Sequence, residues 1–419
     1  MKIEYKPEID GLRAIAVVAV ILYHAKINLF SYQLFEGGFI GVDIFFVISG
    51  YLITSIILKE MILTNSFSFS DFYIRRIRRI LPVLLFIMLV SLPFAWIYLL
   101  PSSLIDFSKS LLYSLGFSSN FYFHYSGQIY GAESGLLKPF LHTWSLSVEE
   151  QYYILFPGVL FIIFKYFKRY LGITLFIFFI ISLYLADWGS KNYPSFSFYA
   201  LPTRGWEVLA GSILAYLEVK LGYRSKSKVL SLILPGFGLL LIVHSIFFFD
   251  HKISHPSFYT LYPVIGVCLI IWFSNKNELI TKILSSKLLV GTGLISYSLY
   301  LWHYPIFAFA RTIDFTSGEL FKIVILLSLV IFFSVLSYFL IERPARNKHY
   351  KSKSIILYIL VSIFIISSFC FLVIYKKGRL NIKNTSIENL ISSPLHKSEC
   401  KYSTGNSNFL TDDFFKNDF

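Results

Sequence analysis

Apolar segments of about 20 residues recur along almost the whole chain, and this feature limits the possible folds more than any other. A helix needs about 20 apolar residues to cross roughly 30 Å of hydrocarbon. Only helices and closed barrels satisfy the backbone inside a bilayer. The apolar runs between polar breaks predict spans at 12–30, 39–58, 80–100, 146–164, 171–187, 202–217, 229–248, 257–273, 294–310, 320–341 and 355–375. We therefore expect an all-α membrane protein, a polytopic bundle of about ten core transmembrane helices plus an eleventh.

The distribution of charge predicts how these helices are oriented. Only 15% of the residues are charged, against about 25% in a soluble domain. The net charge of +14 could indicate nucleic-acid binding, but in membrane proteins Lys and Arg mark cytoplasmic loops, so we expect no nucleic-acid partner. Alternate loops carry most of the cations. They predict a multi-pass protein of the cell inner (cytoplasmic) membrane, with the N-terminus cytoplasmic and the tail from Lys376 extracytoplasmic. The first apolar run, Ala14 to Phe30, should act as a retained signal anchor.

The cysteines do not predict a metal site or a disulfide framework. Cys268 and Cys370 lie in apolar runs and Cys400 lies in the polar tail. None of them has the CxxC or Cys/His spacing that holds zinc. We therefore expect no bound metal.

Two ionisable residues of the first span, Arg13 and His24, share one helix face. They are eleven residues apart, so they differ by about 20° around the axis and by about 16 Å along it. Ionisable groups inside a span usually face a cavity or a partner, and a neutral imidazole can act as a general base on a hydroxyl. The alternative is that Arg13 is a positive-inside anchor and His24 a packing residue near the outer interface.

Asp43 lies just inside the second span, in the run GVDIFFVISGYLIT. A short external turn joins the first two spans, so Asp43 is close in depth to His24 and could orient its imidazole. The alternative is a carboxylate placed at a helix N-terminus by the macrodipole. In either case Gly41 and Gly50 would allow close helix packing.

Four arginines lie immediately before the third span, in the run FYIRRIRRILP. An orientation signal or contact with anionic lipid heads explains such a cluster. A phosphate clamp is the other hypothesis, because arginine forms forked hydrogen bonds with phosphate and the coenzyme A of an acyl donor carries three phosphates. The residues concerned are Arg75, Arg76, Arg78 and Arg79.

The entrance of the fourth span, FLHTWSLSVEEQYYILFP, is unusually polar. Capping by Ser145 or Ser147, with glutamates in the first turn, explains part of this pattern. It does not explain two adjacent carboxylates, about 100° apart around the helix, at the edge of the hydrocarbon. We predict functional roles for His142, Trp144, Glu149 and Glu150.

Two further motifs place polar side chains within apolar runs. In LPTRGWEVLAG, Arg204 and Glu207 are one turn apart and could form an internal ion pair, or could present charge to a substrate or to His24. In ISYSLYLWHYPIF, Trp302 and His303 could be interfacial anchors or could line a channel.

Taken together, these segments resemble membrane-bound acyltransferase family 3, in particular bacterial O-antigen acetylases and peptidoglycan O-acetyltransferases. The matching pieces follow in order across residues 8 to 345: EIDGLRAIAVVAVILYHA, GVDIFFVISGYLIT, FYIRRIRRILP, HTWSLSVEEQYYILFP, the Arg204 to Glu207 pair and SYSLYLWHYPI. The resemblance implies a ten-span acyltransferase core with His24 as the catalytic histidine, Arg13 paired with it, and the arginine cluster on the acyl-CoA side.

The resemblance also predicts the domain organisation. Residues 1–345 would form the acyltransferase transmembrane domain, 346–375 a cytoplasmic loop and the eleventh helix, and 376–419 an extracytoplasmic linker. Relatives often continue into an external SGNH-hydrolase-like domain, and no Gly-Asp-Ser nucleophile motif is present here. Two alternatives stay open: the chain is truncated before such a domain, or it relies on its membrane core alone.

The predicted function is transfer of acetyl from cytoplasmic acetyl-CoA, bound at the arginine cluster with no permanent cofactor, to a hydroxyl of an envelope glycan. O-antigen or lipopolysaccharide is the favoured acceptor, and peptidoglycan or a succinyl donor is an alternative. His24 would act as general base or acyl carrier, Arg13, Arg204, Glu207 and Asp43 would supply charge and orientation, and Glu149 or Glu150 would tune the histidine. His142, Trp144, Trp302 and His303 would bind the substrate. A carrier or flippase for a lipid-linked glycan is the alternative from another class.

Overall fold

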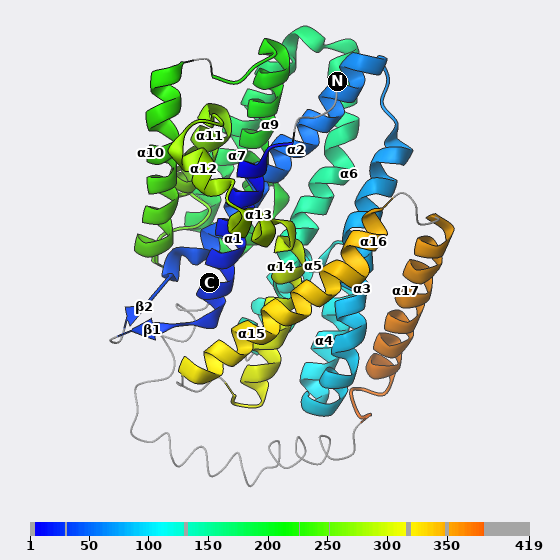
Figure 1. Ribbon diagram of the computed structural model, residues 1–419. Coiled ribbons are helices and arrows are strands. Elements are labelled where there is room, and N and C mark those ends of the chain that lie inside the picture. Colours follow the sequence, from blue (N-terminus) through cyan, green and yellow to red (C-terminus); the bar gives the residue numbers. More distant parts are fainter. Residues whose placement is uncertain are drawn as a thin grey trace. The chain divides into compact units, whose positions relative to one another are not determined.

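The computed structural model describes residues 5–29, 32–129, 133–225, 227–250, 252–315, 320–347 and 352–380. Within these residues the chain is helical except for loops and one small hairpin. Its strands β1 (Asn28–Leu29) and β2 (Tyr32–Gln33) pair antiparallel, with Asn28 opposite Gln33 (Figure 1).

Each predicted span coincides with a helix, which confirms the all-α membrane architecture. The first predicted span, 12–30, extends beyond the end of its helix. Lys26 takes a left-handed conformation with φ 48°, and the helix ends at Ala25. The helices are α1 (Pro7–Ala25), α2 (Gly41–Thr64), α3 (Phe69–Tyr98), α6 (Thr143–Tyr166), α7 (Leu171–Asn192), α9 (Leu201–Leu221), α10 (Lys228–Phe248), α11 (Leu261–Phe273), α14 (Ser296–Thr312), α15 (Leu320–Ser337) and α17 (Ser352–Tyr375).

Seven helices of the described chain are long and apolar enough to cross a membrane by length and composition alone. They contain α2, α3, α6, α7, α10, α15 and α17. The other predicted spans are either short, with 13 residues in α11 and 17 in α14, or rich in charge. In α1 the charged residues are Glu8, Asp10 and Arg13. The chain is thus a multi-pass membrane protein, and its candidate site residues lie both on these seven helices and on the more polar α1 and α9.

The stretch between the third and fourth predicted spans forms two short helices, α4 (Pro101–Leu115) and α5 (Ser119–Gly127). They are separated at Phe117, which has a φ of 49°. With 15 and 9 residues, both helices are too short to span a membrane. The remaining short elements are η1 (Glu36–Ile40), η2 (Gly135–Leu137), η3 (Lys168–Tyr170), α8 (Pro194–Tyr199), η4 (Phe258–Thr260), α12 (Leu279–Leu284), α13 (Lys287–Leu294), the π-helical η5 (Tyr338–Glu342) and α16 (Arg343–Arg346).

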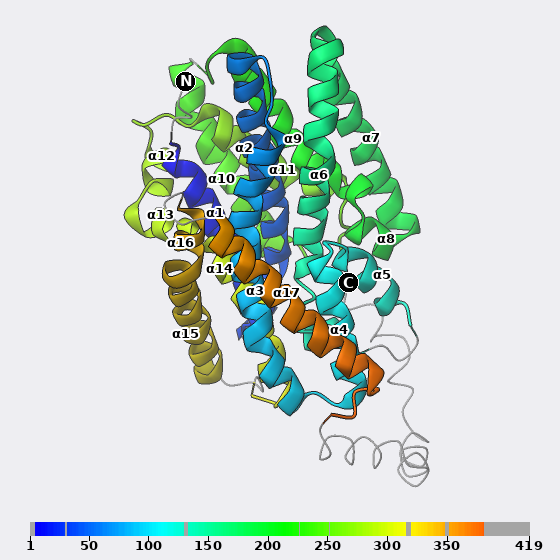
Figure 2. The same ribbon diagram turned by 90° about the vertical axis from the view of Figure 1, so that its right-hand side faces the viewer.

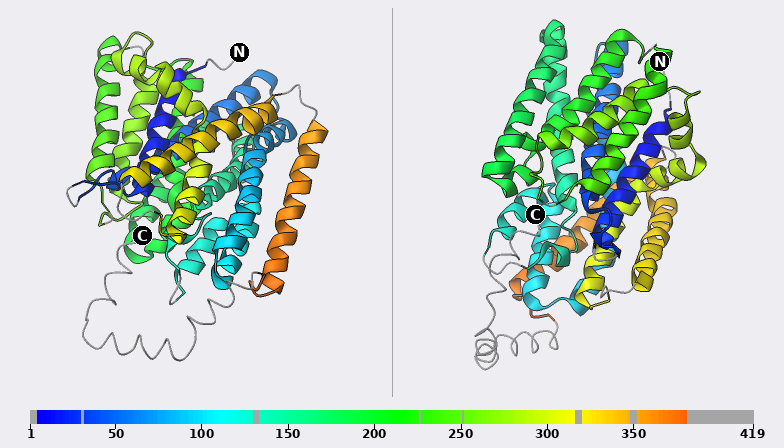
Figure 3. Two further views of the ribbon diagram at one scale, coloured as in Figure 1. Left: turned by 60° about the horizontal axis from the view of Figure 1, so that its bottom comes forward. Right: turned by 90° about the vertical axis from the view of Figure 1, so that its left-hand side faces the viewer.

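The chain divides into two compact units. The first comprises Met1–Ile74 and Ser145–Tyr300, and the second Arg75–Trp144 and Leu301–Phe419. In the first unit α2 lies beside α9, and α10 beside α11 (Figures 2 and 3). In the second unit α17 packs along α4 (Figure 2).

The close approach of α2 and α9 depends on a reciprocal pair of glycines. A Cβ added to Gly50 would lie 1.8 Å from the carbonyl oxygen of Val208, and one added to Gly211 would lie 1.9 Å from that of Val47. A Cβ at Gly41 would similarly lie 2.3 Å from the carbonyl oxygen of Ala16 on α1. The prediction that Gly41 and Gly50 allow close packing is confirmed. Small residues permit such backbone contact between membrane helices, and here they hold α2 against the helix that carries Arg204.

Candidate functional site

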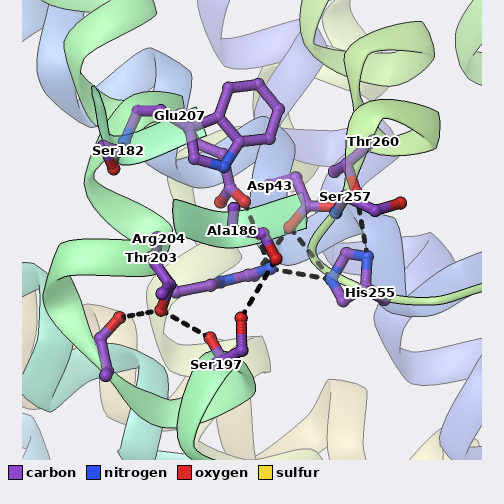
Figure 4. Close-up of polar contacts among 12 residues, drawn as sticks. Asp43, Ser182, Ala186, Ser197, Thr203, Arg204, Glu207, His255, Ser257 and Thr260 are labelled. Carbon is purple, nitrogen blue, oxygen red and sulfur yellow. Dashed lines mark hydrogen bonds and ion pairs between the residues drawn. The ribbon is translucent and has the colours of Figure 1, made fainter. Parts of the chain in front are cut away.

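Four ionisable side chains meet at one end of the first unit. The Nη2 of Arg204 lies 2.7 Å from Oδ1 of Asp43, and its Nη1 lies 3.1 Å from Oε1 of Glu207 and 2.8 Å from Nε2 of His255. Figure 4 shows the Arg204 side chain reaching from α9 toward His255 and both carboxylates. Asp43, Arg204 and Glu207 are each 0% exposed. We call these four residues the buried ion cluster.

Local sequence explains how α9 presents its two members of the cluster. Pro202 lies in the first turn, where a missing N–H has no cost. Arg204 and Glu207 then follow three residues apart on one helix face, which confirms their predicted internal ion pair. The guanidinium also lies over the rings of Phe46 and Phe198, at 5.4 and 5.8 Å from their centroids. A buried charge needs such compensation from several sides.

Asp43 belongs to the first turn of α2, where the macrodipole favours a carboxylate. The sequence suggested His24 as its partner. The structure places Asp43 against Arg204 and, at 3.6 Å, against Nε2 of His255. Asp43 therefore joins α2 to α9 and to the loop between α10 and η4.

His255 is the member of the cluster that sequence reasoning missed. Its Nε2 accepts the hydrogen bond from Arg204, because a guanidinium can only donate. Its Nδ1 must then carry the proton in a neutral ring, and it lies 3.2 Å from Oγ1 of Thr260. Burial, followed by the adjacent charge of Arg204, holds the pKa of His255 well below its usual value. No local pattern marked this histidine, since its ionisable partners Arg204 and Asp43 are 51 and 212 residues earlier in the chain.

His24 lies at the last turn of α1 and is only partly buried. Its Nδ1 lies 2.9 Å from the carbonyl oxygen of Val20. A carbonyl can only accept, so Nδ1 donates and the lone pair of the neutral ring is on Nε2. The arrangement suits a general base, because the imidazole is oriented by the backbone of its own helix.

A series of ring contacts connects His24 with the buried ion cluster. The ring of Tyr23 lies 4.8 Å from His24 and 5.9 Å from Phe39, and Phe39 lies 4.8 Å from His255. All three contacts are edge-on, a favourable geometry for aromatic pairs. The buried ion cluster is thus connected through these rings to the packing around the half-buried His24.

Arg13 pairs with Asp10 near the start of α1, at 3.1 Å. Tyr5 donates to the other carboxylate oxygen of Asp10, at 2.8 Å. Arg13 is three turns from His24 along the helix, about 16 Å, so the two residues share a helix face, and their pairing stays a prediction.

Glu149 and Glu150 both lie in the first unit, on α6. Glu149 accepts hydrogen bonds from the hydroxyls of Ser49 and Tyr153, and Glu150 is 6% exposed. Nearby, Ser145 and Tyr300 share a hydrogen bond of 2.5 Å. Glu149 thus joins α6 to α2 through Ser49, and the predicted influence of both carboxylates on His24 stays a prediction.

The four predicted substrate-binding residues belong to the second unit. His142 packs 5.6 Å from His303 and stacks on Tyr304 at 5.4 Å. The indole of Trp302 stacks on Phe333 at 5.0 Å and donates to Oγ of Ser337 at 3.1 Å. His142, Trp144, Trp302 and His303 are all less than 8% exposed. Their observed contacts are those of packing residues, and substrate binding by them stays a prediction.

The arginine cluster before the third span also lies in the second unit. Arg78 donates from Nε to the carbonyl of Ala345 at 2.8 Å and from Nη2 to that of Asn347 at 2.5 Å. It therefore satisfies the carbonyls that end α16. Arg75 is exposed, while Arg76 and Arg79 are half-buried. Arg75 is thus the most accessible of the four for a phosphate.

Comparison with known proteins identifies the domain. Residues 6–341 match the sequence model of the family described as "Acyltransferase domain". The O-acetyltransferase OatA of Staphylococcus aureus is 33% identical over 365 residues, which cover 83% of this chain and 58% of that protein. The peptidoglycan O-acetyltransferase OatA of Listeria monocytogenes is 33% identical over 359 residues, 82% of this chain and 56% of that protein. The chain thus spans rather more than half the length of these curated relatives. No solved structure matches.

Proposed function

This chain belongs to the membrane acyltransferase family, and from that premise we propose that it is an O-acetyltransferase that esterifies hydroxyl groups of peptidoglycan. The observation that carries the proposal is the half-buried His24, with its Nδ1 committed to Val20 and its ring packed toward the buried ion cluster. Transfer of an acyl group to an alcohol needs a base at the hydroxyl.

The chemistry assigned to His24 is proton removal. Nε2 takes the proton of the sugar hydroxyl as that oxygen attacks the carbonyl carbon of the acyl donor. The C–S bond of a thioester donor then breaks, the sulfur leaves as a thiolate, and the proton held on Nε2 passes to that thiolate, which restores the neutral imidazole. The buried ion cluster, in which Asp43, Arg204 and Glu207 are fully enclosed, is assigned to holding α2, α9 and the His255 loop in place around this histidine.

The proposed acyl donor is acetyl-CoA. The support for it is the cluster of four arginines within Arg75 to Arg79, since guanidinium groups are suited to phosphate. We assign phosphate binding to this cluster, with Arg75 as its most exposed member.

The proposed acceptor differs from the one favoured by the sequence alone. O-antigen and lipopolysaccharide were favoured there, with peptidoglycan as the alternative. The Listeria relative is named a peptidoglycan O-acetyltransferase, and this supports the alternative.

A cell-based measurement tests the acceptor. The chain is expressed in a Gram-negative bacterium that lacks endogenous peptidoglycan and lipopolysaccharide O-acetylation, and acetate released by mild base is measured separately in each fraction. We expect ester-linked acetate in the peptidoglycan of cells with the wild-type chain, and none with His24→Ala at equal membrane abundance. Acetate confined to lipopolysaccharide would refute the proposed acceptor and keep the acyltransferase assignment.

A further inference from the structure

An apolar groove runs between α6 and α7 in the first unit. One cavity of about 230 Å³ is lined by residues of α6, α7 and α9, and an adjoining one of about 560 Å³ continues toward the α6–η3–α7 turn. Both cavities are lined by Val159, Ile163 and Phe178. We call the two together the α6–α7 groove.

The few polar atoms at this groove are engaged elsewhere in the protein. Ser182 donates to the carbonyl of Pro202 at 2.6 Å and accepts from the backbone N–H of Trp206 at 2.9 Å. Tyr152 shares a hydrogen bond of 2.9 Å with Ser212. Apart from the hydroxyls of Tyr170 and Thr174 at one end, the surface that remains is hydrocarbon, which suits an alkyl chain and offers little to a sugar or a nucleotide.

The length of the groove fits the depth of one leaflet. Its lining on α6 extends from Tyr152 to Ile163, about 16 Å at 1.5 Å per residue. One leaflet contributes about half of the roughly 30 Å hydrocarbon thickness. An acyl chain can therefore lie in the groove over the full depth of its leaflet.

One end of the groove is strongly basic. Lys165, Lys168 and Arg169 are exposed beside Phe167 and Tyr170, which line that end. No acidic residue occurs in the sequence between Glu150 and Asp187. The Lys165 Nζ lies 5.3 Å from the ring centroid of Tyr166, and that of Lys168 lies 4.7 Å from the centroid of Phe164, so aromatic rings adjoin both cations at this end of α6.

We propose that the α6–α7 groove binds one anionic phospholipid, with an acyl chain between the helices and the headgroup phosphate against Lys165, Lys168 and Arg169. An alkyl chain matches the hydrocarbon lining, and a phosphate matches the three exposed cations at its end. The groove also touches Pro202, Gly205 and Leu209 of α9, so the lipid packs against the helix that carries Arg204 and Glu207.

Photo-crosslinking tests this proposal without reference to catalysis. The full chain is placed in nanodiscs of neutral lipid that contain equal small fractions of phosphatidylglycerol or phosphatidylcholine, each with a diazirine on the acyl chain. Adducts are mapped by peptide mass spectrometry. We expect phosphatidylglycerol adducts within residues 152–178 to exceed phosphatidylcholine adducts by at least about five-fold, given the attraction of each cation for an anionic headgroup.

Two sets of variants make the result decisive. The triple substitution Lys165→Gln, Lys168→Gln and Arg169→Gln changes exposed positions only, and should reduce phosphatidylglycerol labelling to the phosphatidylcholine level. Ile163→Trp should fill the groove and remove the adducts, whereas Ile177→Trp, an exposed position on α7 outside the groove, should leave them. Equal labelling by both lipids, or labelling that persists in the triple variant, would show ordinary annular lipid and overturn the proposal.

Discussion

At the scale of single residues, Arg204 is the side chain on which most of the site depends. Its guanidinium is fully buried and contacts Asp43 on α2, Glu207 on its own helix and His255 in the α10–η4 loop. Removing one partner from a buried ion pair leaves the other charge uncompensated, which costs much more than losing a surface pair. Substitution of Arg204 should therefore lower the stability of the protein strongly, through its effect on the buried ion cluster.

Replacing Arg204 by Met should destabilise the protein by about 3–5 kcal/mol, because the carboxylates of Asp43 and Glu207 then lose their cation. The matched control is Lys191→Met, which removes the exposed partner of Asp187 and should cost less than about 1 kcal/mol. Thermal unfolding in detergent compares the two. Similar melting temperatures for both variants would contradict the structural role given to Arg204.

The lowered pKa of His255 predicts that the stability of the folded protein decreases in acid. The unfolded chain takes up a proton on this ring as the pH falls below about 6.5, whereas the folded protein, with its lowered pKa, does not. The unfolded state thus binds more protons in this range. The stability that His255 contributes is complete above about pH 6.5, and it is lost as the pH falls from there toward the folded pKa.

The loss of melting temperature between pH 7.5 and pH 5.5 should therefore be larger in the wild type than in His255→Gln, which keeps an acceptor for Arg204 but does not titrate. The exposed His244 provides the control, and His244→Gln should behave as the wild type. An unchanged pH dependence in His255→Gln would show that this imidazole is not the acid-sensitive group.

At the scale of elements, the α2–α9 pair determines where Asp43 and Arg204 meet. The two helices contact through backbone at Gly50 and Gly211, where an added Cβ would collide with a carbonyl of the opposite helix. A methyl group at either position would push the helices apart and separate the two charges. Backbone oxygen cannot move aside as a flexible side chain can.

Gly50→Ala and Gly211→Ala should both lower the melting temperature and the membrane abundance of the protein. Gly158→Ala is the control, because a Cβ there would meet no atom within 4 Å and alanine is the better helix former by about 1 kcal/mol. Equal stability of the three variants would rule out close backbone packing between α2 and α9.

Elements and contacts differed in how well the sequence predicted them. Long apolar runs located the helices, and the i, i+3 spacing located the Arg204–Glu207 pair, since both are local patterns. The pairing of Asp43 with Arg204 and the position of His255 depend on residues 161 and 51 positions apart, for which one sequence carries no signal. Likewise, the role of Arg78 at the end of α16 follows only from the folded chain.

At the scale of the whole molecule, the orientation in the membrane is the most exposed prediction. The positive-inside rule places the end of α7 outside the cell and the α9–α10 loop inside. Asn192 and Ser227 are both exposed in these segments. In a background without native cysteines, a cysteine at Asn192 should react with an impermeant maleimide in intact spheroplasts, and one at Ser227 only after lysis. The reverse labelling pattern would show that the protein has the opposite orientation in the membrane, and the acyl donor would then be assigned to the wrong side.

The central claim is that this membrane domain transfers acetyl from acetyl-CoA to a glycan hydroxyl with His24 as the base. The most direct measurement is transfer of labelled acetyl to soluble peptidoglycan fragments by the purified chain in proteoliposomes. The wild type and His244→Ala should form base-labile labelled ester at equal rates, and His24→Ala should lose at least about a hundred-fold of that rate, as expected for removal of a general base. Ester formation by His24→Ala at the wild-type rate would contradict the account.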